Sequence, residues 1–197
     1  RQLQMCIRDR VNTAPDLMRA HNYVMKKYGY DERKLSDIKK LAGRGSKVML
    51  TKSMHEIAEL SGKIKKTDDV VEKMTKEFVD FYSKNIVKES TLKNGILDFL
   101  GWCKENSILM GVCTNKQEHL SIDLLKKIKI YHFFNYVAGG NTFNHNKPDP
   151  RHLIDTIEII GGEVNKTLMV GDSETDSNAA KAANIPFVLI KDGYTEK

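Results

Sequence analysis

The apolar positions between residues 14 and 88 recur at intervals of three and four, which is the spacing of one helix face. The first series follows Thr13, a candidate N-cap, with Pro15 and Asp16 in the first turn, and it stops at Gly29. The series are Leu17, His21, Val24, Met25 and Tyr28, then residues 38–41 and 48–60, then Val71, Met74, Phe78, Phe81 and Tyr82. This segment is predicted to be all-helical, and its aromatic stripe favours a packed core over a cofactor-binding surface.

After Leu92 the pattern changes to short apolar runs that alternate with amphipathic segments. The predicted strands lie at residues 108–115, 136–140, 167–173 and 187–190, and the predicted helices at 94–107, 117–130, 149–162 and 175–185. Strands that alternate with helices indicate an α/β fold, with a doubly wound parallel sheet covered on both faces. The predicted organisation is a core of residues 11–13 and 89–197 with an inserted all-helical domain of residues 14–88.

Composition narrows the classes of function. The chain has 197 residues, and no apolar run approaches the roughly 18 residues that a membrane span needs. The net charge is +6, but the lysines are scattered among acidic residues, so neither nucleic acid nor a membrane is predicted as a partner. Cys6, Cys103 and Cys113 are odd in number and widely spaced, which argues against a disulfide framework or zinc site and favours a reducing cytoplasm.

Candidate chemistry lies where the predicted strands end. Thr114 and Asn115 follow one strand, Lys147 lies in the loop after the next, and Asp172 and Asp176 follow the third. The carboxyl ends of parallel strands share one edge of the sheet, where α/β proteins bind ligands. A hydroxyl and an ammonium suit phosphate oxygens, whereas carboxylates repel phosphate unless a hard cation such as Mg²⁺ lies between them. The set therefore predicts a metal site that faces a phosphate.

Each of these residues also has an ordinary structural explanation. Thr114 fits the strand preference of threonine, Lys147 before Pro148 fits a turn, and Asp172 or Ser173 fits the N-cap of the next helix. Singly, these explanations are favoured. Together, in this order and at successive strand ends, the functional interpretation is favoured.

The ordered set resembles the haloacid dehalogenase superfamily of phosphotransferases, and within it the phosphoglycolate phosphatases. "VCTN" is similar to the second motif of the family, "KPDP" to the third, "VGDSETD" to the fourth, and "VNTAPDL" to the segment after the first. The resemblance covers Val11 to Lys197. It implies a Rossmann-like core, with the helical insert as its cap domain.

This resemblance implies a Mg²⁺-dependent phosphatase that acts on a small phosphorylated metabolite through an aspartyl-phosphate intermediate. Thr114 and the backbone at Asn115 would hold the transferring oxygens, and Lys147 would neutralise charge. Asp172 would bind Mg²⁺, and Asp176 would complete the acidic shell or orient a ligand water.

Other functions remain open on the same scaffold. A sugar-phosphate mutase, a pyrophosphatase and a non-catalytic phosphate-binding protein all fit, whereas a dehalogenase needs no metal and does not explain the two carboxylates. Arg44, in the loop "LAGRGSK", would meet the distal end of the substrate, and a surface arginine in a turn is an equal alternative. Neither the phosphomonoester nor the oligomeric state follows from the sequence.

The first motif of the family, Asp-x-Asp-Gly-Thr-Leu, is missing. Counted back from Val11, the nucleophile position holds Met5 and the acid/base position holds Ile7, while Asp9 lies two residues out of register. "QMCIRD" resembles the translation of a sequencing adapter, so we expect residues 1–10 to be non-native. The chain also ends without an expected last helix, which suggests a fragment that is inactive as it stands.

These ten residues nevertheless carry a structural prediction. In the family, the strand before the first motif lies in the middle of the sheet, and its loss would leave backbone groups unpaired on both neighbours. Residues 3–7, "LQMCI", are predicted to form a surrogate central strand between the strands that end at Thr114 and Gly171. Residues 8–10 would then bring an arginine near Asp172.

Overall fold

The computed structural model describes residues 2–5, 11–41, 45–61 and 68–190, with the backbone alone at residues 2–5, 56–61 and 68. It divides into two compact units, one formed by the chain up to Asn12 and from Thr91 onward, the other by Thr13–Ser90. The second unit covers nearly the same residues as the helical domain predicted at 14–88. In the described ranges, no helix is both long and apolar enough to cross a membrane.

The first unit contains a five-stranded sheet in the order β5-β4-β1-β6-β7, and every neighbouring pair is parallel. The strands are β1 (Gln2–Met5), β4 (Leu109–Cys113), β5 (Tyr136–Ala138), β6 (Thr167–Gly171) and β7 (Phe187–Leu189). The direction in which strands are added reverses after β1. Strands β4 and β5 extend the sheet on one side of β1, and β6 and β7 extend it on the other. This topology confirms the predicted doubly wound α/β fold.

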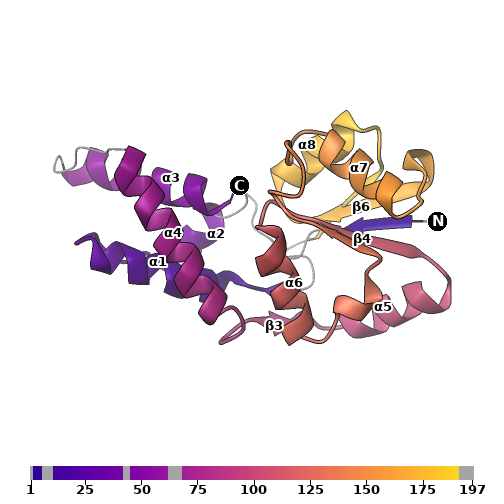
Figure 1. The fold of residues 1–197 in the computed structure, drawn as a ribbon, viewed down its shortest axis with the longest axis horizontal. Coiled ribbons are helices and arrows are strands. Elements are labelled where there is room, and N and C mark those ends of the chain that lie inside the picture. Colours follow the sequence, from indigo (N-terminus) through magenta and orange to yellow (C-terminus); the bar gives the residue numbers. More distant parts are fainter. Residues whose placement is uncertain (1, 6–10, 42–44, 62–67, 191–197) are drawn as a thin grey trace. The chain divides into compact units, whose positions relative to one another are not determined.

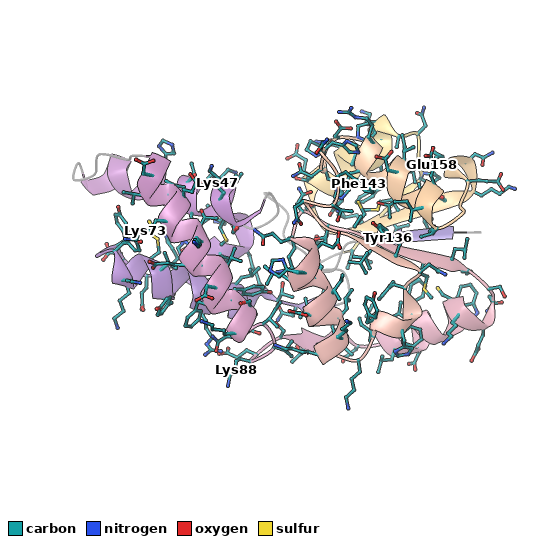
Figure 2. All side chains as sticks on the ribbon, viewed as in Figure 1. Lys47, Lys73, Lys88, Tyr136, Phe143 and Glu158 are labelled. Carbon is teal, nitrogen blue, oxygen red and sulfur yellow. The ribbon has the colours of Figure 1, made fainter. Side chains whose placement is uncertain are left out.

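Helices cover both faces of this sheet (Figure 1). They are α5 (Ile96–Glu105) and α6 (Glu118–Lys127) on one face, and α7 (Arg151–Ile159) and α8 (Glu174–Ala182) on the other. Figure 2 shows Phe143 and Glu158 on the α7 side of the sheet. The core beneath α7 and α8 is apolar, and it consists of Cys113, Leu153, Ile157, Met169, Ala179, Ala180, Ala183 and Ile185.

Strand β1 (Gln2–Met5) confirms the surrogate strand predicted at residues 3–7 over the part that is described, residues 3–5. Met5 pairs with Val112 of β4 on one side and with Val170 of β6 on the other. A doubly covered central strand therefore forms from a sequence that carries no family motif, because its position demands little beyond backbone pairing. The remainder of this prediction, for residues 6–10 and the arginine near Asp172, lies outside the described residues.

The second unit is all-helical, as predicted. Its helices are α1 (Ala14–Lys27), α2 (Leu35–Leu41), α3 (Ser46–Ser61) and α4 (Asp68–Lys84). The stripe on α4 is buried at Met74, Phe78 and Tyr82, and the ring of Phe81 stacks on Tyr23 at a centroid distance of 4.2 Å. The aromatic stripe therefore forms core, which agrees with its interpretation from the sequence.

The two segments that join the units pair with each other. Strand β2 (Val11–Asn12) lies antiparallel to β3 (Thr91–Leu92), in a sheet separate from the main one. Neither strand is predicted from the sequence, because two residues are too short to show a period. Their pairing holds the outgoing and returning segments side by side.

Helix α1 begins differently from the prediction. Thr13 does not cap it, because its backbone already has helical dihedral angles and its side chain makes no capping hydrogen bond. Asp16 does more than complement the helix dipole. Its buried carboxylate accepts hydrogen bonds from the backbone N–H groups of Lys88, Glu89 and Ser90, and from the Ser90 hydroxyl at 2.6 Å. Asp16 thus fixes the segment that returns after α4.

Candidate active site

The predicted strand-end residues meet around the side chain of Lys147. Its Nζ atom donates to the carbonyl oxygen of Cys113 at 2.6 Å and to Oδ1 of Asp176 at 2.6 Å. Lys147 is 3% exposed and Asp176 is 1% exposed, so the ion pair is buried. One lysine thereby joins the end of β4, the loop before α7 and the first turn of α8 (helices in Figure 1).

The residues that follow β4 shape the neighbouring loop. The backbone N–H of Thr114 donates to the carbonyl of Ala138, and the Thr114 hydroxyl oxygen accepts from the N–H of Lys116 at 3.2 Å. The side-chain amide of Asn115 donates to the carbonyl of Lys147 at 2.8 Å. Thr114 therefore follows the end of β4, as predicted. The Asn115 side chain in addition fixes the backbone of Lys147.

The acidic loop after β6 is braced by Asp176. Ser173 caps α8 in a reciprocal capping box with Asp176, so the capping explanation is correct for Ser173. Oδ2 of Asp176 accepts from the N–H of Asp172 at 3.2 Å, and from the N–H and hydroxyl of Ser173 at 3.1 and 2.7 Å. Asp172 is fully buried beside them. The capping and functional interpretations therefore apply to the same loop, since the cap fixes the carboxylates in place.

Mg²⁺ fits only part of this arrangement. Asp172 offers the hard carboxylate oxygens that Mg²⁺ prefers, but Oδ1 of Asp176 lies 2.6 Å from the Lys147 ammonium. In the described part of the chain, no three His, Cys, Asp or Glu side chains are grouped as a metal site. The missing first motif would supply the further carboxylate. The residues present do not complete a Mg²⁺ site, and Arg44 lies outside the described residues.

Two glycines that the sequence analysis did not single out allow the loops to approach. A Cβ atom on Gly139 would lie 2.2 Å from the backbone nitrogen of Glu118, and one on Gly140 would lie 2.6 Å from the carbonyl oxygen of Asn115. A further case is Gly171, where a Cβ would lie 2.5 Å from the Cβ of Asp176. A glycine pair at the end of the strand predicted at residues 136–140 was the available signal, since such glycines mark close backbone approach.

We expect Gly139→Ala to destabilise the protein strongly. The added methyl group meets backbone atoms of Glu118, which have no free space to move into, so the cost should reach about 1–3 kcal/mol or more. Gly101→Ala is the matched control, because it lies within α5 with no atom within 4 Å of the added Cβ. It should stabilise the chain by up to about 1 kcal/mol through helix propensity. Chemical denaturation of both variants measures the difference, and equal stabilities would contradict the close packing at Gly139.

His152, which was not predicted as a site residue from the sequence, lies at the start of α7. Its Nδ1 accepts a hydrogen bond from the backbone N–H of Lys147 at 3.2 Å, and its ring is completely buried. Burial and then the Lys147 ammonium lower the pKa of His152 to about 4. His145 lowers this pKa further, whereas Asp155 and the backbone of Gly139 raise it. The ring is therefore neutral at neutral pH.

This lowered pKa predicts a pH dependence of stability. Between pH 6.5 and about 4 the unfolded chain binds a proton at His152 that the folded chain excludes, so the free energy of unfolding should fall as the pH falls through this range. His152→Asn removes the titrating group, so its stability should fall less from pH 6.5 to 4. His132→Asn, at an exposed histidine, should retain the wild-type dependence. Denaturation at several pH values tests this, and parallel curves for His152→Asn and wild type would contradict it.

Comparison with known proteins places this geometry in a family. A profile of haloacid dehalogenase-like hydrolases matches residues 11–190. A phosphoglycolate phosphatase of Mesorhizobium japonicum is 34% identical over 187 residues, which cover 95% of this chain and 80% of that protein. One of Agrobacterium fabrum is 33% identical over 186 residues, which cover 94% of this chain and 78% of that protein.

Solved structures share the fold. The crystal structure of a predicted phosphoglycolate phosphatase from Haemophilus somnus superposes with a TM-score of 0.93 at 23% identity, covering 100% of this chain and 87% of that chain. A β-phosphoglucomutase from Clostridium difficile superposes with a TM-score of 0.77 at 20% identity, covering 95% of this chain and 83% of that chain. At these identities the likeness concerns the fold alone.

Proposed function

Because the chain belongs to the haloacid dehalogenase-like hydrolase family, we propose that, with an intact first motif, it is a Mg²⁺-dependent phosphatase of small phosphomonoesters such as phosphoglycolate. Relatives at 34% and 33% identity named phosphoglycolate phosphatase support this class of activity. The observation that carries the proposal is the buried ammonium of Lys147, which is held between the end of β4 and the first turn of α8. The loop that leads into α8 also contains Asp172. A lysine ammonium beside carboxylates suits a phosphate together with a metal cation, because the ammonium attracts the phosphate and the carboxylates attract the metal.

The residues of this chain would act mainly by positioning and charge. The Thr114 hydroxyl oxygen accepts from the N–H of Lys116, and the hydroxyl proton would donate to a transferring oxygen. Lys147 would offset negative charge on the phosphoryl group, with Asp176 as its counter-ion. The capping box would keep Asp172 and Asp176 in fixed positions throughout the reaction.

Two groups outside the described chain complete the proposed chemistry. The first aspartate of an intact motif would attack phosphorus in line, and the second would act as general acid and base. Bound Mg²⁺ would polarise the phosphoryl oxygens and screen their charge from the carboxylates, and Asp172 is the residue we assign to it. The match to the family profile begins at Val11, so residues 1–10 lie outside it.

The remaining proposals concern the surroundings of the site. We propose that Arg44 meets a carboxylate at the distal end of the substrate, as the loop "LAGRGSK" suggests. We also propose a reducing cytoplasm as the location, as the odd number and wide spacing of the cysteines in the sequence suggest.

A sugar-phosphate mutase is the alternative, because the sequence does not exclude transfer of the phosphoryl group back to the substrate. Product analysis distinguishes the two in a chain with the restored motif. With ³¹P NMR, a phosphatase yields inorganic phosphate from a panel of phosphomonoesters, whereas a mutase yields an isomeric phosphate ester. Isomer formation without phosphate release would replace the proposal by the mutase, and neither product would favour the non-catalytic phosphate-binding protein.

A further inference from the structure

We propose that His152 is a positioning residue for Lys147, which its imidazole holds through the lysine backbone. The proposal rests on the proposed function, in which Lys147 is the cation of the site. It assigns a role to a buried side chain that touches neither the carboxylates nor the strand-end hydroxyl.

The first link is the peptide unit of Lys147. Its N–H donates to Nδ1 of His152 at 3.2 Å, and its C=O accepts from the side-chain amide of Asn115 at 2.8 Å. Both polar groups of one residue are therefore fixed by side chains from two different segments, α7 and the loop after β4. Since the backbone of Lys147 is held at both groups, the direction in which its side chain leaves the loop is fixed.

The second link runs through Cys113. The carbonyl oxygen of Cys113 receives the Lys147 ammonium, and the Cys113 thiol donates to the carbonyl of His152 at 3.6 Å. The same His152 carbonyl accepts from the Thr156 hydroxyl at 2.6 Å, which anchors it one turn along α7. This second link is made by the backbone carbonyl of residue 152 rather than by its ring. It ties α7 to the strand end where the lysine Nζ terminates, and it is kept in variants of His152.

The protonation state of His152 matches this role. An imidazole accepts at Nδ1 only when it is neutral and carries its proton on Nε2. Complete burial keeps the ring neutral, and the edge of Phe143 packs against it at a centroid distance of 5.8 Å. Apart from Lys147, the ionisable groups around the ring are His145 and Asp155, which pair with each other at 2.7 Å.

Such a hold matters because lysine is a flexible residue. A free lysine side chain samples many rotamers, and fixing it costs about 2 kcal/mol of conformational entropy. If its backbone shifted, the buried ammonium would lose the short contacts to Cys113 and Asp176 together. A histidine that fixes the backbone in advance removes this freedom before the substrate binds.

The first experiment measures the hold itself in the chain as printed. Amide hydrogen exchange at Lys147 is compared in wild type, His152→Asn, His152→Leu and the exposed control His132→Asn. The amide oxygen of asparagine is bonded to Cγ, as Nδ1 is in histidine, so it can accept the same hydrogen bond. Leucine has no acceptor. We expect exchange at Lys147 to be at least about tenfold faster in His152→Leu, and within about threefold of wild type in the other two. Equal protection in His152→Leu and wild type would overturn the proposal.

The second experiment measures the consequence in the chain with the restored first motif. His152→Leu should lower kcat at least about tenfold, and His152→Asn should restore most of it. In a Lys147→Ala background the same His152→Leu change should have no further effect, because the histidine acts through the lysine. An equal loss with and without Lys147 would show a general structural role and overturn the proposal.

The two experiments separate the proposals. If the restored chain releases no phosphate at all, the proposed function fails, while the exchange experiment still decides whether His152 holds Lys147.

Discussion

Replacing residues 1–10 by a segment that ends in Asp-x-Asp-Gly-Thr-Leu before Val11 is expected to convert an inactive chain into a Mg²⁺-dependent phosphatase. In the printed chain the nucleophile and acid/base positions hold Met5 and Ile7, which neither attack phosphorus nor transfer a proton. Enzymes accelerate such reactions by at least about a millionfold, so this change should exceed that of any single substitution. Release of inorganic phosphate from a panel of phosphomonoesters measures it.

The fold supports the insertion of this motif. Strand β1 already occupies the centre of the sheet, and Met5 pairs with Val112 and Val170, close to Thr114 and Asp172 on their strands. A nucleophile placed at position 5 would therefore lie beside the predicted phosphate site without any change of topology. Because the central strand forms from residues that lack the family motif, the core should also fold with the motif in place.

The control for this prediction is the restored chain with asparagine at the first aspartate. It should fold and remain inactive, because only the nucleophile is lost. Activity in the printed chain at the level of the restored one would contradict the assignment of the first motif. Restored chains that fold but release no phosphate with any ester would contradict the phosphatase itself.

The elements were predictable because their signals are local. The helices in residues 14–88 show the helical spacing of apolar residues, and the strands after Leu92 are short apolar runs. The structure has helices and strands where these signals lie. The contacts between distant segments had no such signal. Asp16 and Ser90 are 74 positions apart, and nothing in the residues around either position indicates that the Asp16 carboxylate binds the backbone at Ser90.

The site followed the same division. The strand-end rule brought Thr114, Lys147 and Asp176 to one place, because parallel strands present their ends together. What the rule did not provide is the support around them. His152 lies on the inward face of α7, one turn before buried Thr156, and this polar pair in an otherwise apolar face was the only local sign of its role. The sequence offered Asp172 or Ser173 as the helix cap, and it did not show that the Asp176 carboxylate both completes the capping box with Ser173 and binds the lysine.

Lys147→Ala in the restored chain is expected to lower kcat at least about a hundredfold. The ammonium is the one described cation that hydrogen-bonds to Asp176, and its loss removes an electrostatic group aimed at developing charge. The loss also breaks the buried ion pair with Oδ1 of Asp176, and breaking such a pair costs about 3–5 kcal/mol. Stability must therefore be measured beside activity.

The comparison that isolates catalysis uses Lys166→Ala as the control. Lys166 forms an exposed ion pair with Glu163 at 2.6 Å, so its removal should change stability by less than about 1 kcal/mol and leave kcat unchanged. Activity is compared per folded molecule, well below the midpoint of unfolding of the less stable variant. If folded Lys147→Ala has the same kcat as Lys166→Ala, Lys147 serves only to connect β4 with α8 and the catalytic assignment is wrong. The reason is that no other described cation among the residues that meet there could replace it in phosphate chemistry.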